Sequence, residues 1–405
     1  MICFQDTETL RNDSCRGTTT EFFKYVALLP FLSLVIFVAW PSARAGQHEQ
    51  QILSPEKPVS DGFSLQLPFG LKPDSIYIPE DNPLTQDKID LGRLLFFDAR
   101  LSADDSVACA TCHAPAKAFT DNSQVSTGIN GGRGTRNAPT VINRITGSEQ
   151  FRDGRAATLE EQAKGPLISP LEMGMPDHEA VIEKVKGIAG YRVLFESAFD
   201  RQPNIEDLAR AIASFERTIV SGNSRWDQYV AGDAAAITQA EFRGLALFRG
   251  KGRCTQCHSG WNFTDEKYHN IGIGWDLPER DLGRFIVTNN ENDRGAFRTP
   301  TLREVALTGP YMHDGRFDTL EQVVDYYSSG VIANPYLDVE MRRSNLSLEE
   351  ALELYSQENR SEKRKEFLVQ ELNFTEQEKS DLVAFMMALT GEGWQDIKPP
   401  GSFPD

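Results

Sequence analysis

The sequence predicts a mainly α-helical protein built from two tandem, similar domains with long loops and few strands. Apolar residues recur at steps of three and four over residues 204–220, which is typical of a helix that buries one face. Segments with the strict alternation of a half-buried strand are scarce. The chain also repeats itself, because similar segments follow one another in the same order in both halves.

Helix boundaries follow from capping signals. A first helix begins near Thr85, and Asn204 can cap the helix over 204–220. Capping boxes, in which a Thr is followed three residues later by a Glu, open a helix at Thr238 and a last helix at Thr375. We expect this last helix to end near Gly391.

The internal repeat has three parts. The segment GRLLF at 92–96 precedes the motif CATCH, and FTD follows at 119–121. The segment GLALF at 244–248 precedes the motif CTQCH, and FTD follows at 263–265. We therefore predict two homologous domains, at 84–230 and 231–395, which join near 222–236. A highly charged segment at about 339–372 is predicted to be a helical insertion in the second domain.

The N-terminal residues are typical of an export signal. An apolar run at 25–40 follows Lys24 and precedes Ala43-Arg44-Ala45, so we predict a signal peptide over 1–45 that is removed after Ala45. Four acidic residues before the run are unusual for such a signal, which leaves open a start codon assigned too early or a retained anchor. Cleavage would give a periplasmic protein without stable membrane insertion. Residues 46–83 are predicted to form an extended arm.

Composition restricts the class of partner. The 405 residues are 40% hydrophobic and 25% charged, as in a folded soluble protein. The formal net charge of −17 argues against nucleic-acid binding, which needs a basic face.

The cysteines carry the clearest chemistry. Of the six, Cys3 and Cys15 fall in the predicted signal peptide. The other four belong to two Cys-x-x-Cys-His motifs: Cys109, Cys112 and His113, then Cys254, Cys257 and His258. In such a motif two thiols attach haem covalently and the histidine binds its iron. Zinc would require four ligands where each motif offers three, and a redox dithiol needs no histidine. We expect two covalently bound haem c groups in two cytochrome c-like haem domains.

Five further segments carry a resemblance to a family. NAPT at 137–140, FRDGR at 151–155, QAKGP at 162–166, EM at 172–173 and PYMHDG at 310–315 resemble the bacterial di-haem cytochrome c peroxidases and MauG. The resemblance extends from about residue 84 to 390, interrupted by the insertion. It implies that the first haem meets hydrogen peroxide. The second would supply electrons from a small c-type cytochrome or a cupredoxin.

The resemblance assigns a distal pair to the first haem, namely Glu172 and Gln162. A carboxylate beside the iron can move a proton between the peroxide oxygens, and an amide can hold peroxide or water without a change of charge. A capping or surface role is the alternative for Glu172. The resemblance also implies a calcium ion held by the side chain of Asn137 and the carbonyls of Thr308 and Pro310. Such an oxygen shell suits this cation, although Asn137 could equally be a turn residue.

Three positions depart from most of the family. In most of the family a methionine closes the second haem. Here that position is Tyr327, and MauG also has a tyrosine there. Tyr327 shares a helical face with Leu320, Val323 and Val324. A core tyrosine is the alternative, and Met312 is a poorer ligand candidate. Arg152 replaces the tryptophan between the haems, so electrons either tunnel directly or pass another aromatic residue such as Trp261 or Trp275. Ile129 replaces the histidine that caps the first iron.

Three functions are compatible with these residues. The first is a peroxidase that reduces hydrogen peroxide at the first haem. The second is a MauG-like oxidase that stores two oxidising equivalents across both haems and oxidises a protein substrate. Tyr327 favours this version, because a phenolate stabilises high-valent iron better than a thioether does. A plain electron carrier is the third, but it would have no use for Glu172 and Gln162.

Overall fold

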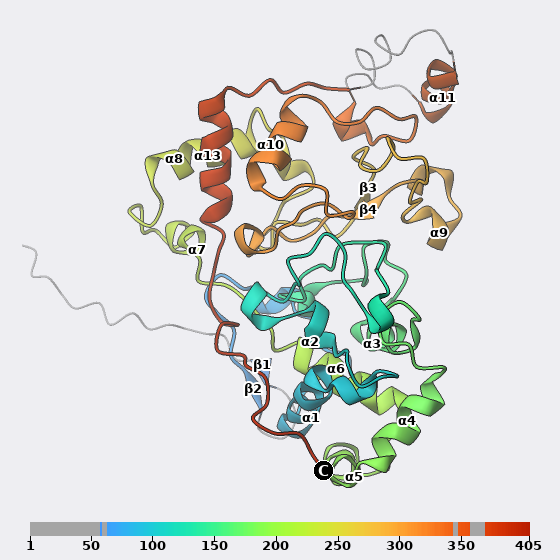
Figure 1. Ribbon diagram of the computed structural model, residues 1–405. Helices are drawn as coiled ribbons and strands as arrows, with labels where there is room; N and C mark the ends of the chain where they lie inside the picture. The colour runs from blue at the N-terminus through green and yellow to red at the C-terminus, as the bar shows by residue number, and fades with distance from the viewer. Residues whose placement is uncertain (1–56, 59–62, 343–346, 357–368) are drawn as a thin grey trace, which may run out of the picture. The chain divides into compact units, whose positions relative to one another are not determined.

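The computed structural model describes residues 57–58, 63–342, 347–356 and 369–405 (Figure 1). The predicted signal peptide and the middle of the predicted insertion lie outside the described residues, as does most of the arm before residue 63. The chain divides into Met1–Gln51 and Ile52–Asp405, and everything below concerns the second unit. Among the described helices, none has both the length and the hydropathy needed to cross a bilayer.

The described chain is mainly helical, as the sequence predicts. Its strands form two short antiparallel pairs, β1 (Lys57–Pro58) with β2 (Ser64–Leu65) and β3 (Tyr268–His269) with β4 (Phe297–Arg298). Lys57 pairs with Leu65, and Tyr268 pairs with Arg298. The α-helices are α1 (Gln86–Phe97), α2 (Cys109–Cys112), α3 (Leu159–Ile168), α4 (His178–Gly187), α5 (Ala189–Phe199), α6 (Ile205–Glu216), α7 (Arg225–Val230), α8 (Gln239–Arg249), α9 (Phe285–Thr288), α10 (Leu320–Ser328), α11 (Leu348–Ser356) and α13 (Glu376–Met387).

The predicted caps open the predicted helices. The side chains of Thr85 and Asn204 accept hydrogen bonds from the first turns of α1 and α6. Both capping boxes are formed, at Thr238 for α8 and at Thr375 for α13. The helical ends were predicted too late, since α6 ends at Glu216 and α13 at Met387. After both helices the chain continues with hydrogen bonds between residues three apart, as in a 3₁₀ turn, which is wound more tightly than an α-helix.

One helix crossing occurs twice. α1 packs on α6, and α8 packs on α13 (Figure 1). A β-carbon at Gly92 of α1 would lie 1.9 Å from the carbonyl oxygen of Ala211, and one at Gly244 of α8 would lie 1.9 Å from that of Asp381. The glycine that opens each repeat is therefore the contact point that lets two backbones approach closely.

A phenylalanine cluster fills each crossing. The ring of Phe96 lies 5.3 Å from that of Phe215 and 6.4 Å from that of Phe119. The corresponding ring of Phe248 lies 5.2 Å from Phe385 and 6.2 Å from Phe263. These clusters belong to two separate hydrophobic cores, and the first cysteine of one Cys-x-x-Cys-His motif packs against each core.

The C-terminal segment returns to the first core. The Trp394 ring packs edge-on against Phe119 at 6.3 Å, and the amide of Gly190 in α5 donates to the carbonyl of Asp405 (2.8 Å). Figure 1 accordingly places the chain end beside α5. Trp226, which lies in the predicted join, packs in the second core, 5.7 Å from Phe385.

Candidate haem sites

The two motif histidines are held in the same way. The Nδ1 of His113 lies 3.2 Å from the carbonyl oxygen of Phe119, and that of His258 lies 3.0 Å from the carbonyl of Phe263. Both phenylalanines have a positive φ (58° and 51°), which turns their carbonyls toward the imidazoles. If Nδ1 carries the proton, Nε2 is free to bind iron. Burial lowers the pKa of both imidazoles, so the neutral, ligating form is favoured.

The four cysteines beside these histidines are free and half-buried. Burial raises the pKa of Cys254 to about 12 and also raises that of Cys109 and Cys112. Cys109, Cys112 and Cys254 are therefore neutral thiols, and thiols beside two apolar cores fit covalent attachment of haem.

A cavity lies beside the second motif. Cys254, Cys257 and His258 line one wall. Arg152 and Arg298 line another part. The remaining lining is mostly apolar and includes Phe248, Leu302, Val305, Leu372, Phe374, Leu382 and Met386. Two thiols, an imidazole, apolar walls and cationic groups together fit a covalently bound haem.

The predicted face of α10 borders this cavity. Leu320, Val323, Val324 and Tyr327 all line it, and so does Met312. Burial raises the pKa of Tyr327 above its usual value. Its hydroxyl has no hydrogen bond within the described residues. The hydroxyl of the neighbouring Tyr326, in contrast, donates to the carbonyl of Ile271 (2.7 Å) and accepts from the amide of Ile332 (3.0 Å).

The predicted distal pair lies on and after α3. Thr158 caps this helix, Gln162 lies in its middle, and Glu172 lies in the loop that follows it. Both side chains are half-buried, and neither forms a hydrogen bond to another described residue. Burial raises the pKa of Cys109 and Cys112, and the negative charge of Glu172 raises it further. The Glu172 carboxylate is therefore close enough to act on the first motif.

Ile129 contacts the same loop. Its amide donates to the carbonyl of Glu172 (2.9 Å), and its side chain is 7% exposed. A β-carbon at Gly174 would lie 1.9 Å from Ile129 Cδ1, so the isoleucine packs tightly against the loop. This position therefore presents a fixed aliphatic side chain beside Glu172.

Asn137, whose side chain is predicted to bind calcium, has other partners. Asn137 Oδ1 accepts a hydrogen bond from Arg152 Nη2 (2.6 Å), while Asn137 Nδ2 donates to the carbonyl of Ser123 (3.0 Å). The peptide between Gly309 and Pro310 is cis. A calcium ion on Asn137 Oδ1, at the usual distance of about 2.3–2.6 Å, would lie beside the Arg152 guanidinium. The arrangement does not fit the calcium site that the sequence predicts.

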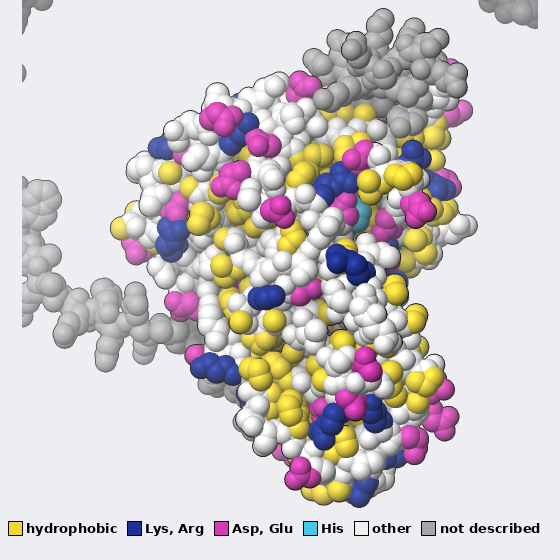
Figure 2. Space-filling view, viewed as in Figure 1, with side chains coloured by type: hydrophobic (Ala, Val, Ile, Leu, Met, Phe, Trp, Pro, Cys, Tyr) yellow, Lys and Arg dark blue, Asp and Glu magenta, His cyan; other side chains and the backbone are white. Residues whose placement is uncertain are grey.

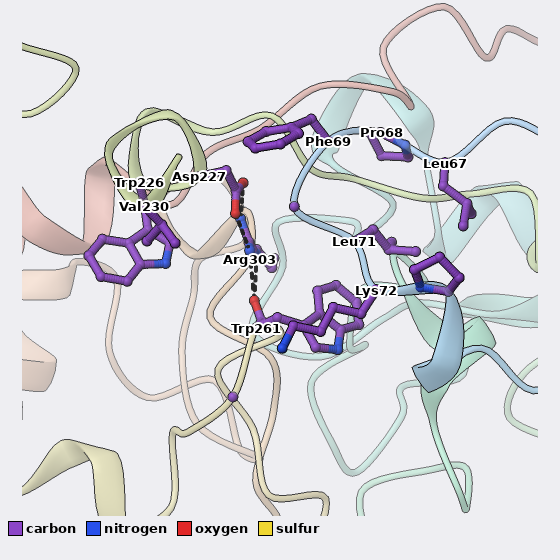
Figure 3. Close-up of a pocket in the computed structure, with 13 residues that line it drawn as sticks. Leu67, Pro68, Phe69, Leu71, Lys72, Trp226, Asp227, Val230, Trp261 and Arg303 are labelled. Atoms are coloured by element: carbon purple, nitrogen blue, oxygen red, sulfur yellow. Dashed lines mark hydrogen bonds and ion pairs between the residues drawn. The ribbon is translucent and has the colours of Figure 1, made fainter. Parts of the chain in front are cut away.

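The two tryptophans proposed as electron relays lie in different surroundings. Trp261 packs against the first core and lines an open pocket with residues 67–73 (Figure 3). Its carbonyl accepts from Arg303 (2.7 Å to Nη2), and that guanidinium is paired with Asp227 (Nη2 to Oδ1, 2.7 Å). Trp275 is buried and stacks on Tyr336 at 5.4 Å. Neither indole is among the residues that line the cavity of the second motif.

Two ionisable groups of the described chain, one buried and one partly buried, were not predicted from the sequence. Glu216 in α6 has a pKa raised to about 8 by burial, and its Oε2 has no hydrogen-bond partner among the described residues. His269 lines the second cavity between Asp265 and Asp338. Burial disfavours its charged form, but Asp338, Cys257 and Asp265 raise its pKa to about 11. The spacing of four between Asp265 and His269 was visible in the sequence, whereas nothing marked Glu216.

Known proteins resemble this chain along most of its length. The family model for di-haem cytochrome c peroxidases matches residues 86–235. The methylamine utilization protein MauG of Methylorubrum extorquens is 41% identical over 287 residues, which cover 70% of this chain and 80% of that protein. Cytochrome c551 peroxidase of Nitrosomonas europaea is 41% identical over 246 residues, covering 60% and 73%. A solved MauG-like protein associated with microbial copper homeostasis superimposes with a TM-score of 0.67 at 33% identity, covering 81% and 96%.

Proposed function

Because this chain belongs to the family of di-haem cytochrome c peroxidases and MauG, we propose that it reduces hydrogen peroxide at the first haem with electrons that enter through the second. Membership makes it a haem c oxidoreductase of the peroxidase type. The two motifs differ in their surroundings, and this difference supports peroxide reduction at the first haem and electron entry at the second. The charge of Glu172 acts on Cys109 and Cys112 of the first motif, whereas the cavity of the second motif is bordered by Tyr327.

The distal residues would handle protons. When bound, each haem supplies an iron that can exchange single electrons with its partners. Reduction of hydrogen peroxide to two waters consumes two electrons and two protons. Glu172 would take the proton from the near peroxide oxygen and return it to the far one as the O–O bond breaks. Gln162 would hold the peroxide by hydrogen bonds without a change of charge.

Tyr327 would act at the second haem. Tyr327 lines the cavity, and its hydroxyl has no hydrogen bond within the described residues. Burial raises the pKa of this phenol, so a phenolate needs a cation to compensate its charge. Ferric iron would provide that positive charge. This observation favours a second candidate function, in which the oxidising equivalents from peroxide are used to withdraw electrons from a protein substrate.

The donor and the compartment are further parts of the proposal. A small c-type cytochrome or a cupredoxin would deliver electrons in the periplasm, after removal of the predicted signal peptide. The net charge of −17 suits a donor with a basic surface. On the face shown in Figure 2, acidic and basic side chains are interspersed, so complementarity there would be local.

The central test is peroxide turnover with a reduced c-type cytochrome, on protein that carries two haems per chain by pyridine haemochrome. Replacing Glu172→Gln should slow turnover by about 10² to 10⁴ with haem content unchanged, because a general acid–base group is lost. Glu179→Gln on the exposed side of α4 is the matched control. Near-normal turnover in Glu172→Gln would return Glu172 to a structural role. Turnover that requires a protein substrate instead of the cytochrome would favour the second candidate function.

A further inference from the structure

We propose that the guanidinium of Arg152 is the resident cation at the Asn137 position, and that this protein holds its two haem domains together without calcium. Arg152 contacts Asn137 twice. Its Nη2 donates to the side-chain oxygen at 2.6 Å, and its Nε donates to the backbone oxygen at 3.3 Å. The first is a short, charge-assisted hydrogen bond to the one side-chain oxygen that the predicted calcium shell requires.

The orientation of Asn137 is fixed by its other partners. Its Nδ2 donates to the carbonyl of Ser123 (3.0 Å), so its Oδ1 must face Arg152. Its backbone amide donates to the carbonyl of His313 (2.8 Å), which ties the residue to the segment after Pro310. Arg152 is anchored too, since its own carbonyl accepts from the amide of Arg298 (2.8 Å). The guanidinium therefore meets a preformed acceptor pair.

The surrounding charge also opposes a divalent cation. Burial, and then the charges of Arg298 and Arg136, lower the pKa of Arg152 to about 9, which still leaves it charged at neutral pH. A calcium ion at Asn137 would thus add two positive charges next to three guanidinium groups. Coulombic repulsion of this kind is large where water is excluded.

Nearby carboxylates are already paired with arginines. Asp153 and Asp281 both bind Arg136, with N–O distances of 2.6 Å. Asp314 pairs with Arg316 at 2.7 Å, and Glu266 pairs with Arg298 at 3.2 Å and with Arg144 at 2.9 Å. None of these four carboxylates is free to balance a calcium ion.

The first experiment measures calcium in the purified di-haem protein. After dialysis against calcium-free buffer, elemental analysis should find far less than one calcium per chain. Addition of EGTA or of calcium should change neither the melting temperature nor the ferric haem spectrum. One calcium per chain, or a melting temperature that EGTA lowers, would overturn the proposal.

The second experiment removes the cation. Arg152→Gln deletes the charge and frees Asn137 Oδ1, so calcium should now bind, seen by titration calorimetry and as a melting temperature that rises with calcium and falls with EGTA. Arg155→Gln is the matched control, because this half-exposed arginine pairs with Asp153 and does not contact Asn137. It should stay indifferent to calcium. A folded Arg152→Gln protein that remains equally indifferent would show that the guanidinium does not stand in for the ion. If that variant fails to fold, the calcium content of the natural protein still decides.

Discussion

Glu216 is a buried carboxyl group whose Oε2 has no hydrogen-bond partner among the described residues. It lies on α6, is 4% exposed, and its charge contributes to the raised pKa of Cys109. Burial raises its pKa from 4.5 to about 8, whereas its neighbour Arg217 is paired with Glu160 at 2.7 Å. The neutral acid is therefore the form that the fold accommodates.

This shift makes stability depend on pH. The folded pKa lies above the unfolded one, so its stabilising effect is complete below about pH 4.5 and is lost as the pH rises through about 8. Between these values the free energy of unfolding should fall by up to about 1.4 kcal/mol per pH unit from this one group. Glu216→Gln should therefore lose less melting temperature between pH 5 and pH 8 than the natural protein does. The exposed Glu196→Gln serves as control, and equal pH slopes for all three proteins would contradict the assignment.

Tyr327 and Tyr326 form a matched pair of adjacent tyrosines. If Tyr327 binds the second iron as phenolate, it favours the ferric state, so Tyr327→Met should raise the reduction potential of that haem markedly. Tyr327→Phe should alter its ferric spectrum. Tyr326→Phe removes only the hydrogen bonds to Ile271 and Ile332 and should leave the spectrum as it was. Redox titration with optical detection measures both effects, and an unchanged spectrum in Tyr327→Phe would make Tyr327 a core residue.

At the residue scale, prediction from sequence is possible where a local pattern carries the information. The face of α10 that contains Tyr327 could be derived from helical spacing, and the structure places all four of its residues at one cavity. The contact between Arg152 and Asn137 could not be derived, because both lie in irregular segments whose approach depends on tertiary packing. Glu216 was not predicted for a different reason. Helical periodicity identifies buried apolar residues, but it does not identify a carboxyl group that is buried on the same helix.

At the scale of elements, the repeated glycine makes a direct prediction. Gly92→Ala and Gly244→Ala would each force a β-carbon into a carbonyl oxygen of the facing helix. Overpacking of this kind costs about 1–3 kcal/mol, which exceeds the gain that alanine normally brings to a helix. Gly187→Ala in α4 is the control, because a β-carbon at that position would have nothing within 4 Å, and the change should be neutral or stabilising. Denaturant unfolding measures all three, and equal stabilities would contradict a close crossing.

Helix ends were predicted less well than helix starts. The pattern over 204–220 continues past α6 because Ile219 and Val220 are buried, at 0% and 3% exposure, although they are no longer helical. Apolar spacing reports burial and does not distinguish an α-helix from a tighter turn that follows it. The strand pairs were invisible in the sequence because two residues cannot establish an alternating pattern.

At the scale of the whole described unit, the two cores are joined by more than the connecting chain. The carboxylate of Glu304 accepts from the hydroxyl of Ser221 and from the amide of Gly391 (2.8 Å), so one buried side chain ties three distant segments together. The C-terminal segment adds Trp394 to the first core. The repeat predicted two similar units. It did not predict that the C-terminal segment packs against the first core, because Trp394 lies after the repeated segments.

This organisation bears on how the second haem could control the first. The family resemblance implies a histidine that caps the first iron until the second haem is reduced, and here that position is Ile129. Ile129 has no atom that can bind iron, and its amide and side chain are fixed against the Glu172 loop. We therefore expect the ferric protein as isolated to show one high-spin and one low-spin haem by electron paramagnetic resonance, and to react with peroxide without a lag. Ile129→Val should behave in the same way, whereas Ile129→His should convert the first haem to low spin and introduce a lag that prior reduction relieves. Two low-spin haems and a lag in the natural protein would mean that another side chain gates the first iron.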